Sequence, residues 1–422
     1  MGEASAQTAL SDYKALVCVF LNGGNDYGNT LVPYDAASHA AYANIRQTLT
    51  TPREALAATA LSQLIGGRQM ALAPQLDKLA GLWDAGKLGV QLNVGTLMQP
   101  TSLAQFKASS VPLPPKLFSH NDQQSVWQAS SPEGATSGWG GRIGDLFMSG
   151  NGSSTFTCIN AAGNAVFLSG RQAVQYQVST SGAVPINGIT KSLFGSAACS
   201  AALRSLTTTD RTHWMEAEVN RVVKRSVEAQ ATLGSVLANV PPLGTAFDTA
   251  GLSTQLQMVA KLIAVRQALG ARRQVYFVSM GGFDLHSQLV AQHPVVLKQV
   301  NDALASFYAA TVELGVADQV TTFTASDFGR TLTSNGDGSD HGWGSHHFVM
   351  GGAVKGGRFY GTLPSVSVNG PDDVGQGRLL PTTSVDQLAA TLATWMGVSA
   401  TDLSLVLPQI GNFSQRDLGY FA

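Results

Sequence analysis

Apolar runs that end in polar, glycine-rich loops are the main pattern along the chain. Residues 15–21 are apolar without interruption, and the run stops at Asn22 and two glycines. Such a run predicts a central parallel strand that is buried on both faces. Apolar positions between residues 76 and 83 then follow a helical spacing, and residues 88–94 predict another strand. Strand, helix and parallel strand in this order indicate an α/β fold with helices flanking a mostly parallel, doubly wound sheet.

The rest of the chain continues this alternation. Residues 151–208 are rich in Gly, Ser and Thr, and the short apolar piece 165–168 resembles a strand. We therefore expect an exposed segment at 1–14 and one domain over 15–422, with a subdomain inserted at about 150–208. The further predicted elements are helices at about 210–239, 252–269, 295–313 and 385–396, and strands at 274–279, 319–323 and 348–350.

Charge and composition exclude two classes of partner. The net charge is -1 and only 13% of residues are charged, with no basic stripe, so the chain lacks the signature of a nucleic-acid binder. No apolar run reaches the roughly 18 residues that a membrane span needs. Three cysteines show no metal-binding spacing. Cys18 lies in a strand pattern and should be buried, whereas a Cys158–Cys199 disulfide is one alternative.

Four of the eight histidines lie in one stretch of the chain, each close to aspartates and glycines. The candidate ligands lie in three segments, of which 280–286 and 324–330 directly follow predicted strands and 340–347 leads into another. The residues that we predict as metal ligands are Asp284, His286, Asp327, Asp340, His341, His346 and His347.

The carboxyl ends of parallel strands meet at one edge of a sheet, so these segments should converge. Asp oxygens and His nitrogens together suit divalent metal, zinc above all, and we expect one or two ions. Alternatively, such residues only fill polar turns. Three segments of this kind at successive strand ends favour a metal or catalytic site.

Ser119 precedes a predicted helix and reads as its N-cap. A helix N-terminus favours anions, and a hydroxyl there is placed to act as a nucleophile next to a metal. The alternative is a simple helix cap. His120, the next residue, either assists the site or lies on the surface. Both residues form our predicted catalytic set.

The loop after the first strand is the third candidate. Asn25, Asp26 and Asn29 could hydrogen-bond an oxyanion or bind a cation, Asn22 begins the same loop, and the glycines let a ligand approach the backbone. A polar turn is the alternative. With Arg330, these residues form the predicted substrate-binding set.

Segments at 16–35, 72–95, 281–288, 326–361 and 407–421 together resemble the exported bacterial family named domain of unknown function 1501. That family is placed with the alkaline phosphatase, sulfatase and phosphoglycerate mutase superfamily. The resemblance implies an alkaline phosphatase-like fold with metal ligands on strand-end loops. It also implies a periplasmic or secreted location after removal of a signal peptide that this chain does not contain.

Single positions carry the resemblance further. Asp284 and His286 resemble the superfamily's Asp-x-x-x-His pair with a shorter spacing. Asp327 is similar to the Asp of its Asp-His pair, with Phe328 in place of the His. His346 or His347 resembles the His before its late core strand.

The departures are equally specific. Asn22 stands where the superfamily places a metal-binding Asp, and Asp26 is a candidate substitute. No Cys-x-Pro-x-Arg motif occurs, which argues against the formylglycine nucleophile of sulfatases.

The resulting expectation is an exported metal-dependent hydrolase of phosphate or sulfate esters, acting on a small-molecule or glycan ester. A non-catalytic metal- or glycan-binding protein with the same fold is the first alternative. A serine esterase of the SGNH kind is the second, because Gly24-Asn25-Asp26 and Asp284-x-His286 resemble two of its blocks. The chain lacks the Gly-Asp-Ser nucleophile block of that class after the first strand.

Overall fold

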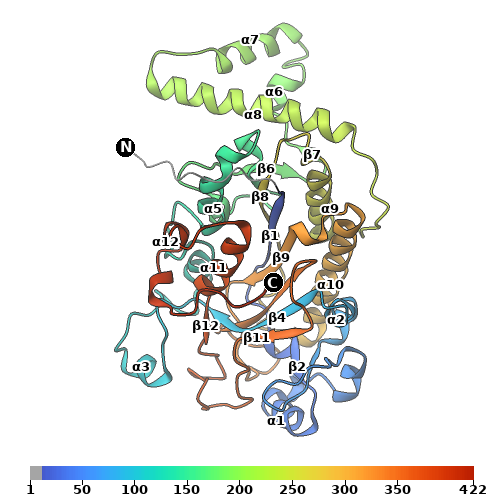
Figure 1. Ribbon diagram of the computed structural model, residues 1–422, viewed down its shortest axis with the longest axis vertical. Coiled ribbons are helices and arrows are strands. Elements are labelled where there is room, and N and C mark those ends of the chain that lie inside the picture. The colour runs from blue at the N-terminus through green and yellow to red at the C-terminus, as the bar shows by residue number, and fades with distance from the viewer. Residues whose placement is uncertain (1–11) are drawn as a thin grey trace.

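A ten-stranded mixed sheet forms the centre of the computed structural model, which describes residues 12–422. The strands lie in the order β11-β4-β10-β9-β1-β8-β5-β6-β7, with β12 beside β4 (Figure 1). Their bounds are β1 Lys14–Leu21, β4 Leu88–Gly95, β5 Cys158–Asn160, β6 Tyr176–Ser179, β7 Gly182–Ala183, β8 Arg273–Met280, β9 Val320–Ser326, β10 Ser345–Gly351, β11 Arg358–Tyr360 and β12 Thr383–Ser384. A separate pair joins β2, Leu31–Pro33, to β3, Met70–Leu72.

Helices surround the sheet. Those of the first half of the chain are α1 Ala36–Arg46, α2 Asp77–Asp84, α3 Leu103–Ala108, α4 His120–Ala129 and α5 Trp139–Phe147. Those of the second half are α6 Asn187–Thr190, α7 Ala197–Thr208, α8 Trp214–Ala238, α9 Gly251–Ala264, α10 Leu289–Glu313, α11 Val385–Met396 and α12 Leu403–Val406. None of the helices within residues 12–422 is both long and apolar enough to cross a membrane.

Alternate residues of β1 face two different cores. Ala15, Val17 and Val19 pack with apolar side chains of α2, α9 and α10. Leu16 and Cys18 face the other side, where α4, α5, α11 and α12 close a second core. Burial on both faces explains why this strand is apolar at every position. The predicted doubly wound α/β class is confirmed by this arrangement.

Three parallel strands end together at one edge of the sheet. β1 is parallel to β8 and to β9, with Leu21 opposite Met280 and Ser326. β10 is antiparallel to β9, so its first residues lie at this same edge. β4 was expected to be a parallel strand of the same unit. It runs in the same direction as β1, but β9 and β10 lie between the two.

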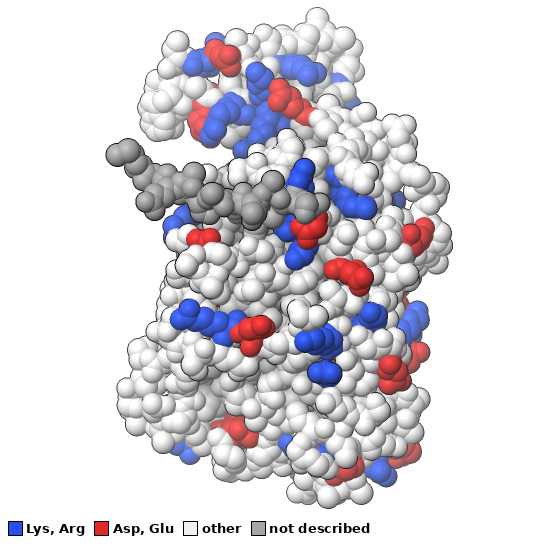
Figure 2. Space-filling model, viewed as in Figure 1, with Lys and Arg blue, Asp and Glu red and all other residues white. Residues whose placement is uncertain are grey.

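Helices α6, α7 and α8 form an arm that projects from one end of the molecule (Figure 1). The arm rests on the rest of the molecule through the last turns of α8, where Ala229 and Leu233 are buried in the first core. On the face shown in Figure 2, Lys and Arg of the described residues are scattered among Asp and Glu instead of forming a stripe.

Several expectations need correction. The piece 165–168 was predicted as a strand, but Val166–Leu168 is a 3-10 helix. Phe167 there packs on α5, and its N–H donates to the Gln128 side chain instead of a neighbouring strand. The Cys158–Cys199 disulfide that we considered as an alternative is not formed, because Cys158 is a buried free thiol and Cys199 is an exposed free thiol. Of the predicted exposed segment 1–14, residues 1–11 lie outside the described part, and Lys14 already belongs to β1.

Candidate functional site

Four of the predicted residues meet where β1, β8 and β9 end. His120 is the first residue of α4, Asp284 and His286 follow β8, and His341 precedes β10. His120, Asp284 and His341 each offer one ligand atom, and these atoms lie within 4.8 Å of one another. Nε2 of His286 lies 3.1 Å from an Asp284 oxygen and 2.8 Å from Nε2 of His341. We call these four residues the His/Asp group.

The other nitrogen of each imidazole contacts an oxygen that can only accept a hydrogen bond. In the neutral form of each ring Nδ1 therefore carries the proton, which leaves the lone pair on Nε2. The contacts join His120 to Asp327 Oδ2 at 2.6 Å, His341 to the Phe118 carbonyl at 2.8 Å, and His286 to Asp340 Oδ1 at 3.2 Å.

The centre of the group then holds only hydrogen-bond acceptors. The Nε2 atoms of His120, His286 and His341 lie 3.1–3.5 Å from the Asp284 carboxylate, with no proton assigned between them. Acceptors at such distances repel unless an additional proton or a metal cation lies among them. Three imidazole nitrogens and one carboxylate are a ligand set that zinc accepts.

Arg330 holds the Asp284 carboxylate in place from the protein interior. Its guanidinium is fully buried and donates at 2.9 Å both to Asp284 Oδ1 and to the Gly23 carbonyl, and it also donates to Ser339. Partial burial alone would raise the pKa of Asp284. The hydrogen bond and charge of Arg330 outweigh it, so this pKa lies below its ordinary value. The carboxylate is thus held ionised and oriented.

The pKa values of two imidazoles are shifted in opposite directions. The hydrogen bond that His120 donates to Asp327 raises the pKa of His120, although burial opposes it. Burial lowers the pKa of His341. The surroundings thus shift the pKa values of two neighbouring rings in opposite directions, and such shifts are typical of functional sites.

Backbone geometry around the group is unusual. Phe118 has φ 72, which is rare for an aromatic residue, and this conformation presents its carbonyl to His341. Gly23 has φ +117, and a Cβ there would lie 2.3 Å from the Asp284 amide nitrogen. Strain and close approach of this kind concentrate at binding sites.

Ser119 precedes the first turn of α4, as expected, but its side chain makes no capping hydrogen bond. Its hydroxyl donates instead to Asp122 Oδ2 at 3.3 Å. The catalytic role of Ser119 stays a prediction. His120, by contrast, belongs to the His/Asp group, a role that we had not predicted for it. Its position at a helix start beside Ser119 was the available signal.

The structure does not bring His346 and His347 into the group. His346 Nδ1 accepts a hydrogen bond from the Asn93 amide at 3.0 Å, and the ring of His347 packs on Trp127. Both rings are buried in β10, and this burial lowers the pKa of each to about 3. These contacts place His346 and His347 in the interior of the protein and not in the His/Asp group.

The predicted substrate-binding loop is largely tied down by internal contacts. Asp26 pairs with the buried Arg46, Asn25 contacts Thr30, and Asn29 accepts from the Tyr42 hydroxyl. These contacts shape the loop that carries Gly23. Asn22 differs, because it lines a cavity beside α4.

Solved structures that resemble this chain are bacterial proteins at low identity. They include the lipoteichoic acid synthase LtaP from Listeria monocytogenes (8% identity, TM-score 0.38, 96% of this chain and 77% of that one). They also include the zinc complex of the C-terminal periplasmic domain of EcEptC from Escherichia coli (11%, 0.39, 94% and 87%). The sulfatase PsFucS1 from Pseudoalteromonas sp. is another (9%, 0.37, 92% and 68%).

The sequence comparisons match the chain to one family, and no curated protein matches it. A family described as protein of unknown function (DUF1501) matches residues 13–407, which is nearly the whole sequence. The chain therefore belongs to the DUF1501 family.

Proposed function

We propose that this protein is a metal-dependent hydrolase of phosphate or sulfate esters that holds one zinc ion in the His/Asp group. The observation that carries the proposal is the convergence of three imidazole nitrogens and one carboxylate as acceptors around one point. Among residues 12–422 no second set of three potential ligands is as close together. The group therefore supports one ion better than two.

The residues around the group prepare it for an ion. Asp327, Asp340 and the Phe118 carbonyl hold the three rings, and such contacts increase the basicity of a ligating imidazole. Arg330 holds Asp284. A zinc ion bound there would supply Lewis acidity toward an ester oxygen or a water molecule.

The group is also accessible to a substrate. The exposed fraction of its four side chains ranges from 24% for His341 to 47% for Asp284. Arg330 is completely buried and each of its three guanidinium nitrogens donates within the protein, so we now assign it to positioning Asp284 and not to substrate binding. An anionic ester would therefore approach from the solvent side.

Metal analysis and turnover together test this proposal. Protein purified without chelator should contain one equivalent of zinc and cleave 4-nitrophenyl phosphate or 4-nitrophenyl sulfate. His286→Ala should lose both properties. His213→Ala is the matched control, because His213 is exposed on the arm, and it should keep both. Wild-type protein without metal would contradict the proposal.

Ser119 has its own test within this proposal. If its hydroxyl is the nucleophile, Ser119→Ala should reduce turnover at least about a hundredfold with zinc retained. If a water molecule attacks instead, turnover should stay near that of the wild type. The stability change should be small in either case, because the side chain makes no capping hydrogen bond.

A non-catalytic metal-binding protein is the second candidate. The engagement of Ser119 by Asp122 favours it, because that hydroxyl is not directed at an imidazole. Zinc without turnover of either ester would select this candidate. The serine esterase has less support, since no serine hydroxyl within residues 12–422 is hydrogen-bonded to a histidine ring.

We further propose that the protein acts outside the cytoplasm. This rests on the resemblance of its segments to an exported family. Fractionation of cells that carry the complete natural gene would test it. A product found uncleaved in the cytoplasm would contradict the proposal.

A further inference from the structure

A polar cavity of about 310 Å³ lies beside α4, the helix whose first residue is His120. One face of α4 forms part of its wall through residues at positions i, i+3, i+4 and i+7. The remaining wall comes from the loops after β1 and β5 and from the end of β8. The lining side chains are Asn22, Asn121, Gln124, Ser125, Gln128, Ala162, Asn164, Ala165, Val166, Phe277 and Ser279.

The cavity and the His/Asp group share their supports. Asn121 follows His120 on α4, so one helix turn serves both. Asn22 precedes Gly23, whose carbonyl accepts from the arginine that holds Asp284. The start of α4 and the loop after β1 therefore contribute both to the cavity and to the surroundings of the group.

The chemistry of the lining is uniform. Five side-chain amides and two hydroxyls provide donors and acceptors, and Phe277 and three aliphatic residues provide the apolar contacts. No charged side chain lines the cavity among the described residues. A charged ligand would lose its hydration here without gaining a counter-charge. A neutral ligand with many hydroxyls would find a partner for both roles of each hydroxyl.

Some of these amides are free to bind. The Asn164 side chain makes no hydrogen bond within the described residues. Gln124 donates to Asn22 Oδ1 at 2.9 Å, which leaves the Gln124 oxygen and the Asn22 amide nitrogen for a ligand. Gln128, in contrast, accepts from the Phe167 amide and supports the wall.

We propose that this cavity binds an uncharged sugar unit, and that the sugar carries the ester cleaved at the His/Asp group. The inference deepens the proposed hydrolase function and rests on it for the ester. The sugar-binding part stands on the cavity alone. It names the substrate class as a glycan or monosaccharide ester with a neutral ring next to the anionic group.

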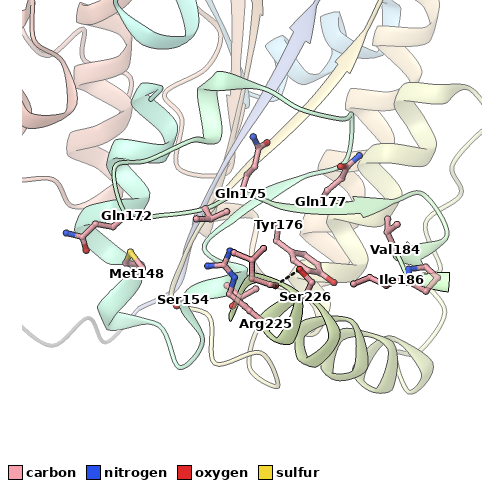
Figure 3. A pocket seen from close by; sticks show the side chains of 14 residues that line it. Met148, Ser154, Gln172, Gln175, Tyr176, Gln177, Val184, Ile186, Arg225 and Ser226 are labelled. Carbon is pink, nitrogen blue, oxygen red and sulfur yellow. Dashed lines mark hydrogen bonds between the residues drawn. The ribbon is translucent and has the colours of Figure 1, made fainter. Parts of the chain in front are cut away.

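A second cavity on the molecule provides the contrast. It has a volume of about 370 Å³ and lies between β6, β7 and α8, and it shares no lining residue with the first (Figure 3). Its lining combines three glutamine amides and three Ser and Thr hydroxyls with apolar residues such as Val184 and Ile186 and with the charged Arg225. Arg225 distinguishes it from the first cavity, and Gln177, an exposed amide in its wall, supplies a matched control.

Saturation-transfer NMR with neutral disaccharides tests the proposal directly. The probes are cellobiose, maltose, lactose and N,N′-diacetylchitobiose at millimolar concentrations. At least one should bind the wild type. Asn164→Leu and Gln124→Leu should each weaken that binding at least about tenfold, or about 1.4 kcal/mol. Gln177→Ala should leave it unchanged.

Two results would overturn the inference. One is the absence of binding by every probe, and the other is binding that both leucine substitutions leave intact. The same titration on His286→Ala separates this inference from the hydrolase proposal, because this variant should lose zinc and turnover but still bind the sugar. If the wild type binds a sugar but cleaves no ester, the hydrolase proposal is refuted and the sugar site is kept.

Discussion

Asp327 shows how one residue outside the His/Asp group controls a member of it. Its carboxylate accepts the Nδ1 proton of His120 at 2.6 Å and is itself buried. We expect Asp327→Asn to lower zinc affinity by about ten- to a hundredfold, because the ring loses its orientation and basicity. Competition with a fluorescent chelator measures this. Asp210→Asn, on the exposed arm, should change nothing; equal affinities for the two variants would contradict the assignment.

Asp386 gives a residue-level prediction for stability against pH. The side chain is buried in α11 and accepts a hydrogen bond from Ser130 at 3.1 Å. Burial raises its pKa to about 6 from the ordinary value of 3.8. The folded state therefore holds this proton more tightly than the unfolded state. The stabilisation is complete below the unfolded pKa and is lost as the pH rises through about 6.

Asp386→Asn removes this dependence. Relative to the wild type, the variant should gain free energy of unfolding between pH 4 and pH 8, by about 1.4 kcal/mol for each unit of the pKa shift. Urea denaturation at both pH values measures the difference, and any constant cost of the amide cancels. A difference that does not change with pH would contradict the raised pKa.

At this scale the sequence predicted chemistry better than position. Asp284, His286 and His341 were identified because Asp and His cluster after predicted strands. His346 and His347 carry the same residue type, but they lie inside β10, whose interior position the local sequence does not reveal. The role of the Phe118 carbonyl was not predictable, because a backbone acceptor carries no residue signature.

The loop after β1 shows what an element contributes to the site. Gly23 approaches the Asp284 backbone so closely that a Cβ would lie 2.3 Å from its nitrogen. Gly23→Ala should lower the free energy of unfolding by about 2 kcal/mol or more and release the zinc, because the loop after β8 must move. Denaturation and metal analysis measure the two effects.

The control for this change is a second glycine in the β8 loop. A Cβ added at Gly281 would have no neighbouring atom within 4 Å. Gly281→Ala should therefore change stability by less than about 0.5 kcal/mol and keep the zinc. Retention of zinc by Gly23→Ala would show that the close approach is not needed for the site.

Elements were predicted well where one local pattern decides them. β1 is apolar throughout, and α11 spans 385–396 as expected because Ser384 and Gln387 form a capping box and Gly397 ends the helix. Pairing was less predictable. The antiparallel β10 separates β4 from β9, and periodicity within a strand does not specify its neighbours.

For the whole molecule, the arm and the site should be independent. Residues 187–221 form most of the arm. Ile186 and Val222, which flank this segment, line the same cavity and therefore lie near each other. A variant in which a short Gly-Ser linker replaces residues 187–221 should fold, bind one equivalent of zinc and keep its turnover. Loss of zinc from a folded variant, judged by circular dichroism, would show that the arm supports the site.

The order of strands along the chain has a consequence for synthesis. β1 is made first, but its neighbours β8 and β9 begin only at Arg273 and Val320. A growing chain that ends before Arg273 leaves β1 with neither partner, and one that ends before His341 lacks part of the His/Asp group. Such long-range pairing should delay completion of the sheet until most of the chain has been made. Until then the chain should remain incompletely folded, which is the state that passage through a membrane channel before folding would require.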